Sequence, residues 1–172
     1  MMLGFLTAAR VCNAIYILGL ALATGGIITA GAFVAPALFK TLPRPDAALA
    51  MGQIFRRFDG LLIATIALTG LGQLGYASLS LMFNKAAASA WTHGAMAQPG
   101  LLFWARLILT AMLIALLAYT VWGLNPQLFR LQSQVGSSAE AAAAFTALHK
   151  QSETLLRLAW LLATALLIST PF

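Results

Sequence analysis

Long apolar runs separated by short polar segments dominate this chain. A helix needs about 20 apolar residues to cross the hydrocarbon core of a bilayer. Runs of about that length occupy residues 13–39, 61–83, 101–123 and 155–171. The pattern predicts an all-α integral membrane protein, with four transmembrane helices in an antiparallel bundle that forms a single domain over residues 1–172. The first run exceeds the apolar core of a signal peptide, so we expect a retained span.

Helical spacing continues into the polar segments that precede the second and fourth spans. The stretch DAALAMGQIFRRFD, which follows the breaker LPRP, sets apolar residues at helical intervals beside Arg56 and Arg57. Before the last span, Ser137 followed three residues later by Glu140 has the pattern of a capping box. Both patterns predict helical extensions outside the membrane.

Small residues in the first span indicate close helix packing. Ala23, Gly26, Ala30 and Gly31 recur at near-helical spacing, as a packing stripe between membrane helices requires. Pro36 is expected to loosen the last turns of this span, because it leaves a backbone carbonyl without its usual donor.

Composition supports a membrane location. Of the 172 residues 61% are hydrophobic and 8% are charged, against about 25% charged in soluble domains. Ten basic residues scattered among apolar runs form no basic face, so we expect the bilayer as partner and no nucleic acid. The lone Cys12 excludes a disulfide within the chain and a cysteine-based zinc site.

The distribution of basic residues predicts orientation. Seven lie in or beside the segments 40–60 and 124–154, against three on the opposite side. The positive-inside rule places those two segments in the cytoplasm and both termini in the periplasm of a cell inner membrane. The seven are Lys40, Arg44, Arg56, Arg57, Arg130, Lys150 and Arg157, and the three are Arg10, Lys85 and Arg106. All four carboxylates, Asp46, Asp59, Glu140 and Glu153, fall on the predicted cytoplasmic side, and none lies in a predicted span.

One cluster near the fourth span has the residue types of a catalytic site. In FTALHKQSETLLRLAW, the side chains of His149, Ser152 and Glu153 could share a helix face. A regular helix lacks the oxyanion donors and the nucleophile turn that acyl transfer needs. We therefore favour a polar interfacial turn over a catalytic site. No catalytic residue is predicted, and we expect a protein that is not an enzyme.

Cofactor and metal sites find little support in the residue pattern. His93 and His149 lie at opposite membrane faces, too far apart to ligate one haem iron. The six methionines form no Met-rich run that would indicate copper. No cofactor or metal ligand is predicted. Lipid or pigment in the grooves of the bundle stays compatible with the sequence, since neither needs a side-chain motif.

Three polar side chains stand inside or near the ends of the spans. Arg106 and Arg157 lie about one and a half turns from their faces, where a long side chain can snorkel to the headgroups. Gln73 lies at mid-depth, and an amide there needs a partner. We favour an interhelical hydrogen bond over a substrate contact.

The chain resembles the bacterial membrane proteins grouped as domain of unknown function 4149, which are similar to eukaryotic transmembrane protein 205. The matching elements, in chain order, are Ala35, Pro36 and Phe39; Ile54, Phe55 and Phe58; Asn125, Pro126 and Arg130; and Phe145, Leu148, His149 and Ser152. Leu156 departs from the pattern, because family members often have Asn there. The resemblance implies a four-helix membrane protein without an established reaction. It also gives weight to His149, which we expect to bond across the bundle to the segment 46–59.

Two functions follow from these observations. The first is a non-enzymatic structural or accessory subunit that packs on a larger respiratory, photosynthetic or transport assembly. The alternative is a small transporter, channel or efflux component for a neutral or cationic solute. A polar lining through Gln73, Thr69 and Thr110 would distinguish the second function.

Overall fold

The computed structural model describes residues 2–90, 100–135 and 138–170, and this part of the chain is helical with no strand. Two short π-helices, η1 and η2, interrupt the first and third long helices. The elements are α1 (Met2–Ile28), η1 (Thr29–Val34), α2 (Ala35–Thr41), α3 (Arg44–Ala90), α4 (Leu101–Ala118), η2 (Tyr119–Leu124), α5 (Asn125–Gln132) and α6 (Ala139–Ser169).

Four helical rods in the described residues are long and apolar enough to cross a membrane, namely Gly4–Thr41, Leu49–Met82, Leu101–Gln132 and Ala139–Ser169. The all-helical, multi-pass class predicted from the sequence is therefore confirmed. Each rod extends beyond the apolar run that predicted it, because the helix continues into its polar flanks. The shortest, with 31 residues, is about 45 Å long, well over the ~30 Å of hydrocarbon.

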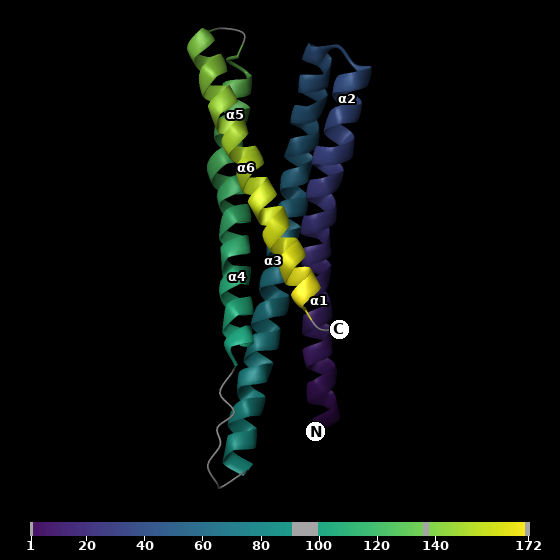
Figure 1. Ribbon diagram of the computed structural model, residues 1–172, viewed down its shortest axis with the longest axis vertical. Helices are drawn as coiled ribbons and strands as arrows, with labels where there is room; N and C mark the ends of the chain where they lie inside the picture. The colour runs from purple at the N-terminus through teal and green to yellow at the C-terminus, as the bar shows by residue number, and fades with distance from the viewer. Residues whose placement is uncertain (1, 91–99, 136–137, 171–172) are drawn as a thin grey trace.

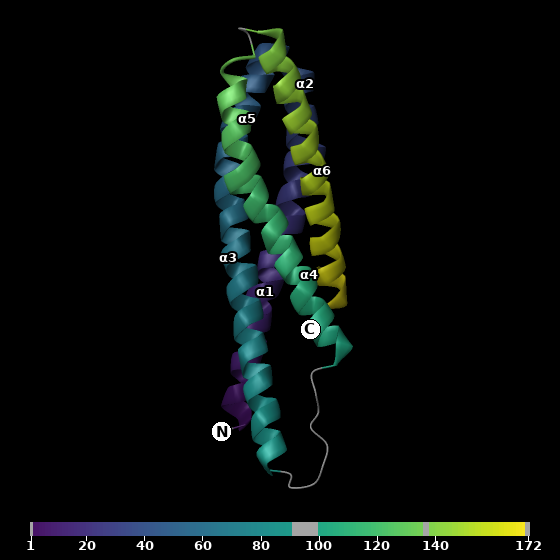
Figure 2. The ribbon, with the colours of Figure 1, turned by 90° about the vertical axis from the view of Figure 1, so that its left-hand side faces the viewer.

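The rods lie lengthwise beside one another. α1 and α3 run side by side over most of their length, and α4 lies along α3 (Figure 1). α6 crosses obliquely and contacts both α1 and α4 (Figures 1 and 2). At the end near the N-terminus, α1 and α3 continue past the first turn of α4 (Figure 1). α2, α5 and the first turns of α6 gather at the other end.

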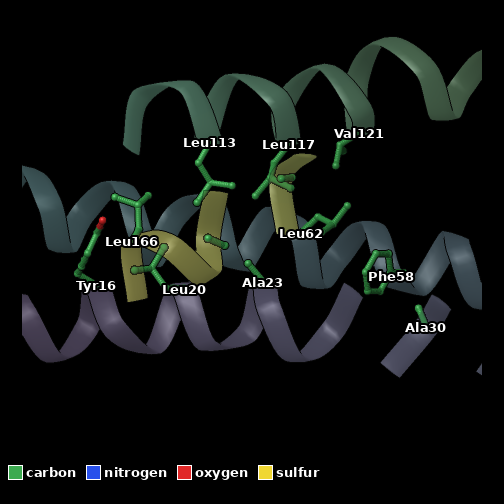
Figure 3. Close-up of a cluster of buried hydrophobic side chains, with 12 residues drawn as sticks. Tyr16, Leu20, Ala23, Ala30, Phe58, Leu62, Leu113, Leu117, Val121 and Leu166 are labelled. Carbon is green, nitrogen blue, oxygen red and sulfur yellow. The ribbon is translucent and has the colours of Figure 1, made fainter. Parts of the chain in front are cut away.

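A hydrophobic core extends along the middle of the bundle between α1, α3, α4 and α6 (Figure 3). Leu20, Leu62, Leu113, Leu117 and Leu166 are almost completely buried there. Each of the four long helices contributes at least one of these side chains, so the core ties all of them together.

Glycines set the distance between α1 and α3. A Cβ at Gly72 would lie 2.5 Å from the backbone nitrogen of Tyr16, and one at Gly19 would lie 2.7 Å from the backbone nitrogen of Thr69. The two backbones therefore approach as closely as small residues allow. The predicted stripe is wrong at Gly31, which has no atom within 4 Å of its Cβ position and is exposed. The other members, Ala23, Gly26 and Ala30, do face neighbouring helices.

Both π-helices precede a proline, and their geometry has the same cause. Proline has no backbone N–H to donate, and its ring clashes with the carbonyl of the residue four positions earlier. That carbonyl belongs to Ala32 in η1 and to Trp122 in η2, where the wider π turn gives the ring space. The N–H of Ala35 bonds to Ala30, and that of Asn125 to Thr120, five residues back in each case. Pro36 thus loosens the first span as predicted.

The sequence after each π-helix is repeated. Proline is followed by any residue, leucine, phenylalanine and a basic residue at both places. The two copies are Pro36, Leu38, Phe39 and Lys40, and Pro126, Leu128, Phe129 and Arg130. The first and third rods are thus built alike where they bend.

The cap of α6 differs from the predicted one. The N-cap is Ser138, whose Oγ accepts a hydrogen bond from the N–H of Ala141 at 3.0 Å. The capping box predicted at Ser137 is wrong by one position, because the helix begins at Ala139 and Glu140 no longer stands three residues after the cap. Ser137 itself lies outside the described residues.

Replacing Gly72 with Ala should destabilise the bundle by about 1–3 kcal/mol, because its Cβ would overlap backbone atoms that cannot rotate away. Thermal unfolding in detergent would measure the loss. Gly25→Ala is the matched control, since no atom lies within 4 Å of that Cβ position. Equal unfolding temperatures for the two variants would contradict the close approach of α1 and α3.

Candidate functional site

A guanidinium group lies among polar and aromatic side chains between α1, α3 and α4. The Nε of Arg106 donates to Gln73 Oε1, and its Nη2 donates to Asn13 Oδ1, both at 2.9 Å. The guanidinium carbon lies 4.2 Å from the ring centroid of Tyr16 and 4.8 Å from that of Tyr76. Arg106 therefore binds groups on two other helices, with an aromatic ring near it from each.

Helical spacing explains why these groups converge. Asn13 and Tyr16 stand three residues apart on α1, so they share one face of that helix. Gln73 and Tyr76 have the same spacing on α3. Arg106 and Thr110 stand four apart on α4. The hydroxyls of Tyr16 and Thr110 share a hydrogen bond of 2.8 Å. Six side chains, which we name the Arg106 cluster, link the three helices: Asn13, Tyr16, Gln73, Tyr76, Arg106 and Thr110.

The Arg106 cluster confirms one sequence prediction and corrects another. Gln73 makes an interhelical hydrogen bond, as expected of an amide inside a span. The snorkelling predicted for Arg106 is wrong, since the side chain turns inward to Gln73 and Asn13. The sequence analysis also missed Asn13, Tyr16 and Tyr76. Their spacing three residues apart was the available signal.

A second polar contact joins α3 to α5 at the opposite end. Asn125, which is buried, donates from Nδ2 to Asp59 Oδ1. Asp59 lies in the 34-residue rod Leu49–Met82, which is longer than the hydrocarbon core, and it precedes the predicted span 61–83. The apolar run used for the prediction began only at Leu61, after this residue.

Next to this contact is an open groove of about 200 Å³ between α3 and α5. Arg56 lies over the ring of Phe129, with its guanidinium carbon 5.2 Å from the ring centroid. Arg57 is exposed and points away from the core. The groove is lined by Leu49, Gly52, Gln53, Arg56, Phe129, Gln132 and Ser133.

The candidate catalytic cluster on α6 does not assemble. Ser152 is only 7% exposed and faces the bundle, whereas His149 and Glu153 are about half exposed. His149 Nε2 lies 3.2 Å from Glu153 Oε1, and its ring stacks on Phe145. Within the described residues the interactions of His149 stay within α6, so the bond predicted to the segment 46–59 is not found there. Arg157 is 79% exposed and lies 3.6 Å from the same carboxylate.

Polar side chains also line part of the interior. Thr65, Thr69 and Gln73 follow one another at four-residue intervals along α3 and are almost fully buried. Within the described residues, several buried polar atoms have no hydrogen-bond partner. These are Thr24 Oγ1, Thr65 Oγ1, Thr69 Oγ1, Gln73 Nε2, Trp160 Nε1 and Thr164 Oγ1.

A metal site is not apparent in the described ranges, where no three residues among His, Cys, Asp and Glu gather closely enough to hold an ion. His93 lies outside those ranges, in the segment 91–99.

Comparison with known proteins identifies a family. The profile described as a domain of unknown function, DUF4149, matches residues 18–124, which is more than half of the chain. The chain belongs to this family. The DUF4149 match includes the end of α1 and all of η1, α2, α3, α4 and η2, with Gln73, Tyr76 and Arg106. It ends before Asn125 and before the resembling residues on α6. No curated protein and no solved structure matches this DUF4149 chain.

Replacing Asn125 with Ala should lower the free energy of unfolding by about 1 kcal/mol, because it leaves Asp59 without its amide donor inside a membrane protein. Thermal unfolding of Asn125→Ala, Asp59→Ala and the double variant would measure the coupling. The double variant should be hardly less stable than either single variant. Additive losses would show that the two side chains do not interact.

Replacing His149 with Ala should change the free energy of unfolding by less than about 0.5 kcal/mol, since the side chain is half exposed and its ionic partner is on the same helix. Ser152→Leu, which would force a larger apolar side chain into the bundle at a buried site, should cost more. A large loss for His149→Ala would instead support a bond across the bundle. Chemical unfolding in mixed micelles would compare the two variants.

Proposed function

We propose that this DUF4149 protein is a non-enzymatic accessory subunit of the cell inner membrane, which packs laterally on a larger membrane complex. The observation that supports it best is an open groove of about 730 Å³ along the outside of the bundle, between α4 and α6. Its lining is apolar except for one tyrosine hydroxyl: Met112, Ala115, Leu116, Tyr119, Leu158, Leu161 and Leu162.

A transmembrane helix of a partner subunit is the proposed occupant. Membrane helices associate by van der Waals packing, which requires a complementary surface and small residues that allow close approach. Ala115 stands in the groove between larger side chains, and Met112 and Leu161 are more than half exposed. The side chains of one further helix would fill such a groove by packing their ridges into it.

The packing between α1 and α3 also favours an accessory role over a conduit. The two backbones meet at Gly19 and Gly72, which leaves no space for a solute between these helices. The Arg106 cluster links α1, α3 and α4 by direct hydrogen bonds. In this proposal no residue has a catalytic, cofactor-binding or metal-binding role.

The proposal includes an orientation. The end that bears α2, α5 and the first turns of α6 has most of the basic residues, including Lys40, Arg56 and Arg130. We place this end in the cytoplasm and the N-terminal end in the periplasm, by the positive-inside rule. The four rods then form an antiparallel bundle, and the start of α3 and of α6 are its cytoplasmic extensions.

A transporter or channel for a neutral or cationic solute is the second candidate. The observation in its favour is the row of buried threonines on α3, in which Thr65 and Thr69 have hydroxyls without a hydrogen-bond partner among the described residues. Buried polar groups of that kind are usually satisfied by water or a ligand. A path along them would need an oligomer, because the bundle itself is closely packed.

Replacing Leu161 with Trp should fill the groove and release the protein from its complex, since the indole would occupy the volume that the partner helix needs. We expect the variant to migrate alone on a native gel of mildly solubilised membranes, with its unfolding temperature unchanged. Leu71→Trp is the matched control, since Leu71 is similarly exposed on α3 but outside the groove.

Mass spectrometry of the gel band would identify what migrates with the wild-type chain. A large assembly that retains Leu71→Trp and loses Leu161→Trp supports the accessory subunit. Wild-type migration alone or as a small homo-oligomer contradicts it and favours the transporter.

A further inference from the structure

Among the described residues, no aspartate or glutamate side chain forms an ion pair with the Arg106 guanidinium. All four acidic side chains of the chain lie in the segments 46–59 and 140–153. The nearest along α3 is Asp59, fourteen residues before Gln73, which corresponds to about 21 Å of helix. The two hydrogen bonds of the Arg106 guanidinium go to the neutral amides of Gln73 and Asn13. A charged side chain inside a span is energetically costly, and such a residue usually marks a functional site.

Hydrogen-bond donors around Arg106 also exceed the acceptors. A guanidinium has five N–H groups and no acceptor, and two of its nitrogens use one bond each. Because Gln73 must present its oxygen to Arg106, its amino group points elsewhere. That Nε2 has no partner among the described residues, in a side chain that is only 3% exposed. The Arg106 guanidinium thus has more N–H groups than its two hydrogen bonds use, together with a positive charge, which suits an oxyanion.

The depth of Arg106 indicates where such an anion comes from. Arg106 stands five residues after the first residue of α4, about 8 Å along the helix. Trp104, two residues before it, is exposed, as an aromatic side chain at the membrane interface would be. Arg106 itself is only partly buried, so part of its side chain is accessible from outside the bundle. We take α4 to enter the bilayer at its first turn, which places Arg106 just below the lipid phosphates.

We propose that Arg106, held in place by Gln73 and Asn13, binds the phosphate of a net-anionic membrane lipid, such as phosphatidylglycerol, at the end of the bundle near the N-terminus. Arginine suits this role because its planar N–H groups match two phosphate oxygens at once. The guanidinium lies over the rings of Tyr16 and Tyr76, and these contacts hold it in place for the lipid. A net-anionic lipid fits better than phosphatidylethanolamine, whose own ammonium group already neutralises its phosphate.

Native mass spectrometry of the full chain, in a neutral detergent with equal amounts of phosphatidylglycerol and phosphatidylethanolamine, tests the proposal. We expect the wild type to retain phosphatidylglycerol preferentially. Arg106→Gln should retain it about tenfold less, the usual effect of losing a charge-assisted hydrogen bond. Arg157→Gln is the matched control and should bind as the wild type does, because Arg157 is exposed on the outside of α6 and faces Glu153.

A second variant protects the test against misfolding of Arg106→Gln. Gln73→Glu retains an acceptor for the Nε of Arg106 and supplies a carboxylate that neutralises it, so the fold should persist while the preference for phosphatidylglycerol disappears. Undiminished preference in this variant, or equal retention of both lipids by the wild type, would overturn the proposal. Inorganic phosphate is then added as a competitor. If it displaces the lipid at millimolar concentration, the ligand is a soluble oxyanion and the lipid assignment is wrong.

Discussion

The close approach of α1 and α3 is the constraint on which the other contacts depend. Gly72 allows the backbone of α3 to meet that of α1 at Tyr16. With the backbones at that distance, Gln73 and Tyr76 on one helix lie opposite Asn13 and Tyr16 on the other. Arg106 then reaches both helices at once. A side chain at Gly72 would separate the helices, and the contacts of Arg106 would lengthen with them.

The sequence predicts the spans well because burial in lipid demands long apolar runs, which can be read along one dimension. It predicts the direction of a polar side chain poorly, because that depends on two other helices. Arg106 illustrates the difference: its depth alone suggested that it snorkels, whereas its amide acceptors on α1 and α3 turn it inward. His149 illustrates the reverse, since an in-helix carboxylate four residues away supplied the partner that was sought across the bundle.

The repeated proline segments are alike in backbone and unlike in chemistry. Both π-helices end one residue before an X-Pro pair, and both are followed by leucine, phenylalanine and a basic residue. At the X position the first copy has Ala35 and the second has Asn125, whose amide bonds to Asp59. The shared backbone therefore reflects the steric demand of proline, while the single polar substitution at X links α5 to α3.

The two ends of the bundle differ in the partners of their charged side chains. At one end an acid, Asp59, accepts a hydrogen bond from the amide of Asn125, so it has a partner within the chain. At the other end, the acceptors of Arg106 among the described residues are two neutral amides, and no side-chain carboxylate forms an ion pair with it there. Neutralising a cation so close to the interface then falls to a group from outside the helices, and the phosphate of a lipid is the anion that a bilayer always presents at that depth.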